Sequence, residues 1–514
     1  MKADPIFAQS RLSITGVLAA VLVAAIVLVP LWSSDIPPLL DYPNHLARQY
    51  IIFKLPQSAL LQQFYQVQWT ATPYLAMDGI VRLLATFLAV DTASKVFVSI
   101  ALASVAVAPL ALNLALFGRV TPIALVGLLF VHSSTVSLGF VNYVFSAGFA
   151  ICLLALWIAL RNGAAWRKFA LFPILSTLLY FSHLVGFVTY AVVVGAYELG
   201  RHVGRVREQP AGARSFFAAL PRLELASLAV QFVLPAAIQL LFRPASSVLA
   251  EITYGGLWRK FELLGGLFFN LIEPYSWTLD RGLAIGLTAA AVLLAVARRL
   301  VVPTPMLWPL VAMALLVIAM PMELFGGWGA DHRLLLPLGM LIAGSVRLKS
   351  WSRSGWTIAV ATLAALVLTR VAAITIDWRK ANAEYAAYQR AFDALPDGST
   401  VYFAFGHAGE QKIWPHPEYH IPFLALKTKQ VYMPYLFTAA NIVMRYAPAY
   451  ENLQRSSKGP VLKNHASPNW QALLTSYDYA LLVNDQLFDT PVPRELVPVV
   501  QEGKVRLYKN SLRN

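Results

Sequence analysis

The chain has 514 residues, of which 58% are hydrophobic and only 13% are charged, against about 25% charged residues in an average soluble domain. Its net charge is +15, but Lys and Arg cluster between apolar blocks, a pattern that reports membrane topology and excludes nucleic acid as the expected partner. The single cysteine, Cys152, excludes a disulfide or a cysteine metal site within the chain.

Apolar blocks predict the membrane-spanning part of the chain. A helix needs about 20 apolar residues to cross about 30 Å of hydrocarbon. The run over 13–32 contains no charge and is longer than a signal-peptide core, so it is interpreted as an uncleaved first span. A second span is predicted at about 71–90, and further blocks lie at about 96–117, 139–160, 171–199, 223–242, 282–297, 304–322, 333–346 and 356–376.

We expect about eleven transmembrane helices. The block 171–199 is predicted to cross twice, with a break near Ser182 and His183, and the segment near 120–138 is predicted to be bent or partial. With Lys2 and Arg11 in the cytoplasm, residues 33–70 and 243–281 form outside loops, and the last span delivers the tail to the outside.

The tail has a different composition, rich in Pro, Asn, Tyr and charged residues. A helix over about 380–394 leads into strand-like runs at 400–405, 430–435, 479–484 and 504–509. The predicted fold is therefore an all-α polytopic membrane bundle over residues 1–378, followed by a small soluble α/β domain over residues 379–514.

The first outside loop is the most informative segment. It reads SSDIPPLLDYPNHLAR over 33–48 and places Asp35, Asp41, His45 and Arg48 just beyond the first span, where prolines fix the backbone. A carboxylate at this depth has a route to a raised pKa and to the role of a general base. The alternative is an ordinary polar loop with Pro-Pro turns. Residues 50–69 suggest a helix that lies along the membrane surface.

A second cluster, Asp331, His332 and Arg333, is expected on the same side of the membrane as Asp41. An arginine at the interface can bind phosphate through two parallel hydrogen bonds, although interfacial arginines that reach toward water are common. The loop over 251–280 mixes aromatic and charged residues, which is more typical of a membrane interface than of a sugar site.

Other polar residues have simpler explanations. Asp78 and Arg82 lie four residues apart and can pair on one helix face, either as a structural pair or as part of a wall of the site. Three single polar groups in apolar surroundings are expected to make hydrogen bonds between helices: His132, Asn142 and His183. The tail histidines lack the spacing of a metal site, which leaves a metal there as the minor alternative: His407, His416 and His420.

Three segments together resemble the GT-C superfamily of integral membrane glycosyltransferases. They are LLDYPNHLAR just after the first span, DHRLLLP over 331–337, and the tail runs YDYALLVN and VRLYKN. Members share a cytoplasmic N-terminus, an essential acidic residue in the first outside loop and often an extracytoplasmic C-terminal domain. The adjacent acidic pair of many members is absent here, since Asn44 and His45 follow Asp41.

The resemblance implies transfer of a sugar from a polyprenyl-phosphate-linked donor, with inversion, to a glycolipid, polysaccharide or protein at a bacterial inner membrane. Membrane lipid is a further partner, no cofactor is required, and a divalent metal stays open because some relatives use one. The implied catalytic residues are Asp41, Asp35 and His45. The implied substrate-binding residues are Arg333, His332, Arg48, Asp331, Tyr42 and Asn44.

Two other classes of function remain open. A lipid-linked glycan flippase, a polymerase or another transporter would also be polytopic, although transporters usually show internal repeats and none is evident in this sequence. A non-catalytic membrane scaffold acting through its tail is the third alternative. The enzyme hypothesis requires Asp41 and Arg333 to face the same site.

Overall fold

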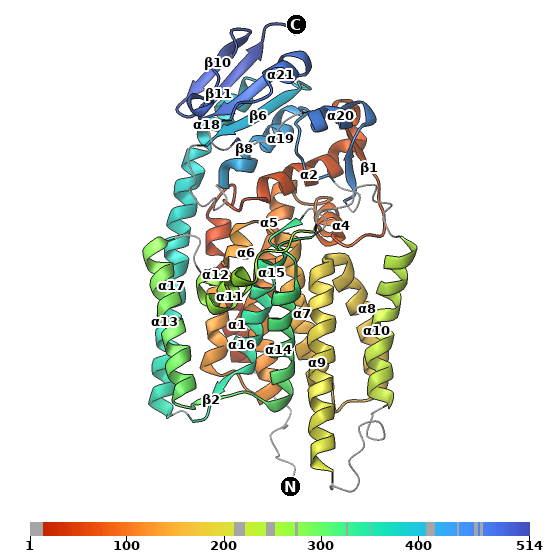
Figure 1. The fold of residues 1–514 in the computed structure, drawn as a ribbon, viewed down its shortest axis with the longest axis vertical. Coiled ribbons are helices and arrows are strands. Elements are labelled where there is room, and N and C mark those ends of the chain that lie inside the picture. The colour runs from red at the N-terminus through yellow and green to blue at the C-terminus, as the bar shows by residue number, and fades with distance from the viewer. Residues whose placement is uncertain are drawn as a thin grey trace.

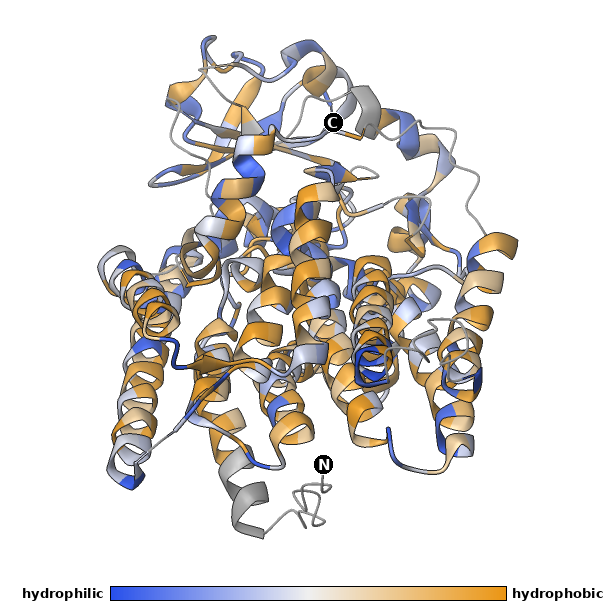
Figure 2. Ribbon diagram, turned by 60° about the horizontal axis from the view of Figure 1, so that its bottom comes forward, coloured by the Kyte–Doolittle hydropathy of each residue, from blue (hydrophilic) through white to orange (hydrophobic). Residues whose placement is uncertain are grey.

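A bundle of apolar helices fills the lower part of Figure 1, and a mixed α/β tail covers its upper end. The computed structural model describes residues 14–209, 222–242, 252–272, 276–324, 327–350, 352–407, 417–438, 442–456, 461–462 and 466–513. Hydropathy separates the two layers, because the bundle helices are apolar over most of their length whereas polar residues are more frequent in the tail (Figure 2).

Six helices within the described ranges are long and apolar enough to cross a membrane: α5 (Val90–Phe117), α7 (Val141–Ala159), α9 (Leu184–Glu208), α10 (Arg222–Leu241), α13 (Trp277–Val296) and α17 (Arg353–Glu384). Shorter elements complete the bundle: α1 (Ile14–Trp32), η2 (Pro122–Phe130), α6 (Ser134–Ser137), α8 (Ala165–Ser182), α14 (Thr304–Ala319) and α16 (Leu335–Ser345). This arrangement confirms the predicted multi-span membrane fold.

Two irregular features of the bundle were expected from the sequence. The block 171–199 forms two helices, α8 and α9, joined at His183, whose extended backbone has φ −169°. The segment near 120–138 forms the 3-10 helix η2 and the short helix α6, packed against α5, α16 and α17. Such irregular backbone is tolerated in a membrane protein where other helices bury it.

The predicted second span at about 71–90 is wrong. The helix found there, α4 (Leu75–Leu84), has ten residues. At 1.5 Å per residue this is about 15 Å, half of a hydrocarbon core of about 30 Å. The helix α4 instead packs on α2 (Tyr42–Lys54), α5 and α8 at the tail side of the bundle, and the next long helix begins at Val90.

The first loop is folded and joined to the tail. After α2 it forms η1 (Leu55–Gln57), α3 (Ala59–Phe64) and β1 (Tyr65–Val67). The strand β1 pairs antiparallel with β7 (Met444–Tyr446), with Tyr65 opposite Tyr446. The expected surface helix over 50–69 is therefore interrupted, because its last residues pair with a tail strand instead of continuing along the membrane.

The remaining loops carry short elements. On the tail side lie α11 (Leu257–Gly265), α12 (Leu267–Ile272), α15 (Ala330–Arg333) and the paired strands β3 (Glu323–Leu324) and β4 (Gly327–Trp328). The strands β2 (Leu300–Val301) and β5 (Arg347–Leu348) pair at the opposite end of the bundle (Figure 1).

The tail sheet has the strand order β10-β11-β9-β6-β8, in which β6 is parallel to β8 and β9 and the other pairs are antiparallel. The strands are β6 (Val401–Gly406), β8 (Val461–Leu462), β9 (Tyr479–Val483), β10 (Leu496–Glu502) and β11 (Val505–Asn510). The tail helices are α18 (Ala386–Asp393), η4 (Pro417–Leu424), α19 (Ala425–Lys429), α20 (Pro448–Ser456), α21 (Trp470–Ser476) and η5 (Asp485–Leu487). Three of the four expected strands are present, whereas 430–435 makes only an isolated bridge.

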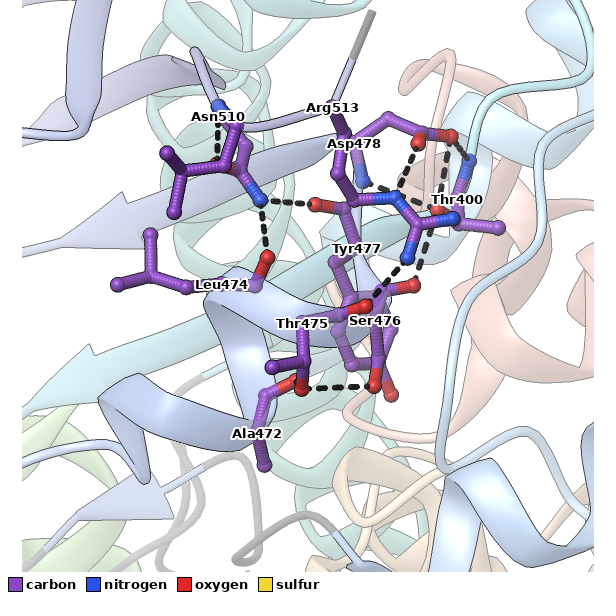
Figure 3. Close-up of polar contacts among 10 residues, drawn as sticks. Thr400, Ala472, Leu474, Thr475, Ser476, Tyr477, Asp478, Asn510 and Arg513 are labelled. Atoms are coloured by element: carbon purple, nitrogen blue, oxygen red, sulfur yellow. Dashed lines mark hydrogen bonds and ion pairs between the residues drawn. The ribbon is translucent and has the colours of Figure 1, made fainter.

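Side chains at the end of α21 fasten the last strand to the tail core (Figure 3). Asp478 accepts hydrogen bonds from the backbone N and the hydroxyl of Thr400 at 2.9 and 2.8 Å, and from Arg513 Nε at 3.1 Å. The amide of Asn510 donates to two backbone carbonyls at 2.7 and 2.9 Å. These bonds connect β6, β9 and β11 and hold these strands of the tail sheet together.

Candidate functional site

Asp41 precedes the first residue of α2, where the loop from α1 turns under the tail. Its backbone N donates to the Leu138 carbonyl at 3.3 Å. The neighbouring Gly139 has φ +79°, and a Cβ at this position would lie 2.5 Å from the Asp41 backbone N. Only glycine permits this approach of the 138–140 turn, and the close contact fixes the place of Asp41.

The Asp41 side chain is mostly buried, with 14% of its surface exposed. Burial raises the pKa of its carboxyl to about 7, and the positive charge of Arg333 partly opposes this shift. A carboxyl with this pKa is ionised and protonated in similar amounts near neutral pH, which suits a group that takes up and releases a proton.

Arg333, at the end of α15, lies close enough to Asp41 for its charge to influence the pKa of that carboxyl. Its guanidinium carbon lies 3.8 Å from the centre of the Phe140 ring, and its Nη2 donates to the Trp328 carbonyl at 3.0 Å. Tyr143 fixes its backbone by donating a 2.7 Å hydrogen bond to the Arg333 carbonyl. No carboxylate of the described residues forms an ion pair with Arg333, so its charge is available to an anionic ligand.

A strained tyrosine lies beside Arg333. Tyr74 has φ 90°, a left-handed conformation that costs about 1–3 kcal/mol for a bulky side chain. Its ring packs edge-on against His183 at 4.5 Å, and the same imidazole contacts Tyr143 at 5.2 Å. The hydroxyls of Tyr74 and Tyr143 are both close enough to influence the charge of Arg333.

Asp331 and His332 anchor the loop that carries Arg333. Asp331 is fully buried and accepts bonds from Lys260 Nζ at 2.6 Å and Arg259 Nε at 3.2 Å. Burial favours the neutral form of Asp331, but these cations outweigh it and lower its pKa. Burial also lowers the pKa of His332 to about 4, and its Nε2 lies 3.3 Å from the Ser134 hydroxyl.

The other residues of the first loop have different surroundings. Asp35 is exposed, and its charge acts on Lys95 rather than on Arg333. Arg48 forms a buried ion pair with Asp78 at 2.7 Å. The expected pair of Asp78 with Arg82 is thus wrong, because a more distant arginine reaches Asp78 while Arg82 lies over the ring of Trp69 at 5.2 Å.

Tyr42 and Asn44 lie in the first turn of α2. Tyr42 is fully buried, and its hydroxyl has no hydrogen-bond partner among the described residues. Asn44 is fully buried as well. Its Nδ2 donates to the Tyr435 carbonyl at 3.2 Å, and its Oδ1 accepts from the Phe437 backbone N at 3.0 Å. The structure therefore places Asn44 as a link between α2 and the tail.

Two histidines border Asp41. His45, one turn further along α2, hydrogen-bonds to the backbone of Gly139. His420, from η4 of the tail, has its Nδ1 3.5 Å from Asp41 Oδ1. From the sequence, His420 is a candidate only for a metal ligand, and its repeat with His416 in a proline-rich segment is the sole signal of a special role. His416 lies outside the described residues, and the described part of the chain contains no group of three metal-ligating side chains.

Two of the three single polar groups of the bundle, His132 and Asn142, make the predicted hydrogen bonds between helices. His132 Nε2 lies 2.8 Å from the Val27 carbonyl on α1, and Asn142 Oδ1 accepts from the Met77 backbone N at 3.0 Å. His183 instead caps its own helix, because its Nδ1 accepts from the Val185 backbone N at 3.1 Å.

A buried arginine of α17, Arg370, joins four elements. Arg370 of α17 pairs with Asp280 of α13 at 2.7 Å, and its other donors reach the carbonyls of Leu129, His132 and Ile272 at 2.8–2.9 Å. A lone arginine within the apolar block 356–376 was the signal that could have identified it, since charge within a membrane segment is costly without partners.

The fold matches a solved membrane protein over nearly its whole length. The crystal structure of ArnT from Cupriavidus metallidurans, bound to undecaprenyl phosphate, aligns with 98% of this chain and 99% of its own at a TM-score of 0.51 and 13% sequence identity. No protein-family model and no curated sequence matches the chain. At this identity the likeness establishes the fold, and it confirms the predicted membrane bundle with a C-terminal mixed sheet.

Proposed function

We propose that this protein transfers a sugar from a polyprenyl-phosphate-linked donor to a glycolipid, polysaccharide or protein acceptor at the outer face of a bacterial inner membrane. Two facing groups carry the proposal: Asp41, whose buried carboxyl has a pKa of about 7, and Arg333, whose charge no described carboxylate pairs with. The shared fold with ArnT, which was crystallised with undecaprenyl phosphate, supports the same class of donor.

The proposed reaction uses Asp41 as the general base. Its carboxylate takes the proton of the acceptor hydroxyl, and the acceptor oxygen forms a bond to the anomeric carbon of the sugar. The bond between that carbon and the phosphate oxygen breaks on the opposite face, so the configuration inverts. Arg333 donates hydrogen bonds to the phosphate as it gains charge, and polyprenyl phosphate leaves.

The surroundings of the first-loop residues favour Asp41 over Asp35 as the base. Asp35 is exposed to solvent, whereas Asp41 is mostly buried and lies across the site from Arg333. A general base is most effective when its pKa is near the working pH. Burial provides this for Asp41.

The proposed orientation has the N-terminus in the cytoplasm and the tail outside. The basic strand β5 and the arginines beside β2 lie at the end of the bundle opposite the tail, as expected for cytoplasmic loops. The site then lies toward the outer side, where a polyprenyl-linked donor exposes its sugar.

The test is sugar transfer in membranes that contain the wild-type protein, Asp41→Asn or the matched control Asp35→Asn. Radiolabelled polyprenyl-phosphate sugars are supplied, and label is counted in lipid, polysaccharide and protein fractions. We expect Asp41→Asn to lose transfer by on the order of 10²–10⁴-fold at normal protein level, as for loss of a general base, and Asp35→Asn to retain it.

Two outcomes would contradict the proposal. Full transfer by Asp41→Asn would exclude Asp41 as the base. No transfer by the wild type with any donor, together with movement of a labelled lipid-linked glycan across vesicles that contain the protein, would identify a flippase.

A further inference from the structure

The tail contributes a histidine to the surroundings of Asp41. His420 of η4 and His45 of α2 both contact the Phe437 ring, with ring centres 5.3 and 5.1 Å from it. Phe423 also packs edge-on against His420, with ring centres 5.6 Å apart. Two aromatic rings of the tail therefore fix the orientation of the His420 imidazole beside the Asp41 carboxyl.

The contact between the tail and α2 is firmly held. Asn44 makes two backbone hydrogen bonds that clamp the tail segment 435–437 onto α2, in the turn that separates Asp41 from His45. The pairing of β1 with β7 and the ion pair of Lys427 with Asp91 add two further attachments. His420 thus keeps its place relative to Asp41 without a ligand present.

Burial determines the charge states of His420 and His45. Burial lowers the pKa of His420 to about 4 and the pKa of His45 to well below its ordinary value, so both imidazoles are neutral at pH 7. Among the described residues, the titratable or charged groups near Asp41 are Arg333 from α15, His420 from η4 and, one helical turn along α2, His45. Arg333 alone is charged among the three.

The nitrogen of His420 that faces Asp41 has no other role in the described residues. Its Nδ1 is buried without a hydrogen-bond partner and lies 3.5 Å from Asp41 Oδ1. A buried nitrogen that makes no hydrogen bond is costly. Hydrogen bonds at catalytic sites are often long without substrate and tighten in the substrate complex. A small movement of either side chain would complete this bond.

We propose that His420 is a positioning residue for Asp41. The Nδ1 of His420 hydrogen-bonds to Asp41 Oδ1, so that Asp41 Oδ2 faces the acceptor hydroxyl. The tail is then part of the active site and not a separate module. This inference rests on the proposed function for its kinetic consequence, but the contact itself can be measured without any substrate.

The substrate-free test is infrared spectroscopy of the purified full-length protein across a pH titration. The band of the protonated Asp41 carboxyl is identified by its loss in Asp41→Asn. We expect His420→Phe to raise the C=O stretching frequency of this band, because phenylalanine keeps the site buried but removes the hydrogen-bonding nitrogen. The control His407→Phe changes another tail histidine and is expected to leave the band unchanged.

The kinetic test measures sugar transfer by the same variants. We expect His420→Phe to lower kcat by about 10- to 100-fold with little change in the KM for the donor, the scale of loss when a reacting group is misplaced. His420→Gln, which retains a polar side chain, should recover part of this activity. His420→Leu replaces His420→Phe in both tests if the latter fails to fold.

Together, the two tests distinguish failure of the proposed role of His420 from failure of the proposed glycosyltransferase function. An unchanged carboxyl band and wild-type kcat in His420→Phe would overturn the role of His420. A shifted band in a protein that transfers no sugar would keep the contact and reject the glycosyltransferase proposal.

Discussion

Asp41 and Asp331 lie on the same side of the bundle, yet the pKa values of their carboxyls are shifted in opposite directions. Asp331 is fully buried, and its pKa is lowered because Lys260 and Arg259 outweigh the effect of burial. Burial raises the pKa of Asp41 to about 7, and no Lys or Arg of the described residues forms an ion pair with it. Cations at hydrogen-bond distance therefore reverse the effect that burial has on the pKa of a carboxyl.

The arginines also differ in whether they have an ion-pair partner. Arg370 and Arg48 are almost fully buried, and a carboxylate of the protein neutralises the charge of each. Arg333 has no described carboxylate partner and rests against Phe140. The site that we propose for chemistry is thus the place where a carboxyl and a guanidinium both lack an ion pair with a charged group of the described residues.

The largest expected effect comes from removing the charge of Asp331, the carboxyl that is ion-paired. Asp331→Asn leaves Lys260, which is 2% exposed, without its charge partner. Removal of one member of a buried pair costs about 3–5 kcal/mol. We expect a strongly lowered Tm in detergent, measured by intrinsic fluorescence. The double variant Asp331→Asn with Lys260→Met should regain much of the loss, and a Tm equal to wild type in the single variant would contradict the comparison.

Arg333→Gln tests the unpaired cation. Hydrogen bonds to charged groups contribute about 1.5–3 kcal/mol, which corresponds to a loss of roughly 10- to 100-fold in affinity for undecaprenyl phosphate. Binding of the radiolabelled lipid to purified protein measures this loss. Arg82→Gln is the matched control, because Arg82 lies over Trp69 and outside the proposed site. Equal binding by Arg333→Gln and wild type would remove Arg333 from the phosphate site.

The smallest expected effect is a shift of the pH profile. The base must be ionised, so kcat should fall as the pH decreases below about 7, the pKa to which burial raises Asp41. The Arg333 charge lowers this pKa, and its removal in Arg333→Gln should move the acid limb to higher pH. Transfer rates over a range of pH values measure both. A profile that stays flat below pH 7 would show that Asp41 does not limit the reaction.

Much of the fold follows from local sequence. Apolar blocks predicted the bundle, and a change of composition predicted the mixed tail, because both signals extend over many consecutive residues. The second span failed because the block 71–90 has the composition of a crossing, whereas its helix α4 has only ten residues and packs on α2, α5 and α8. Hydropathy does not report where a helix ends.

The sequence by itself determined that the chain is a membrane bundle with an acidic first loop and a late arginine near the same surface. Only the tertiary structure decided which charges meet. It paired Asp78 with Arg48 instead of Arg82, brought His420 from the tail to Asp41, and left Arg333 without a described carboxylate partner. The physical reason is that hydropathy accumulates along the chain, whereas burial and Coulomb interactions depend on distances through space between residues far apart in the chain.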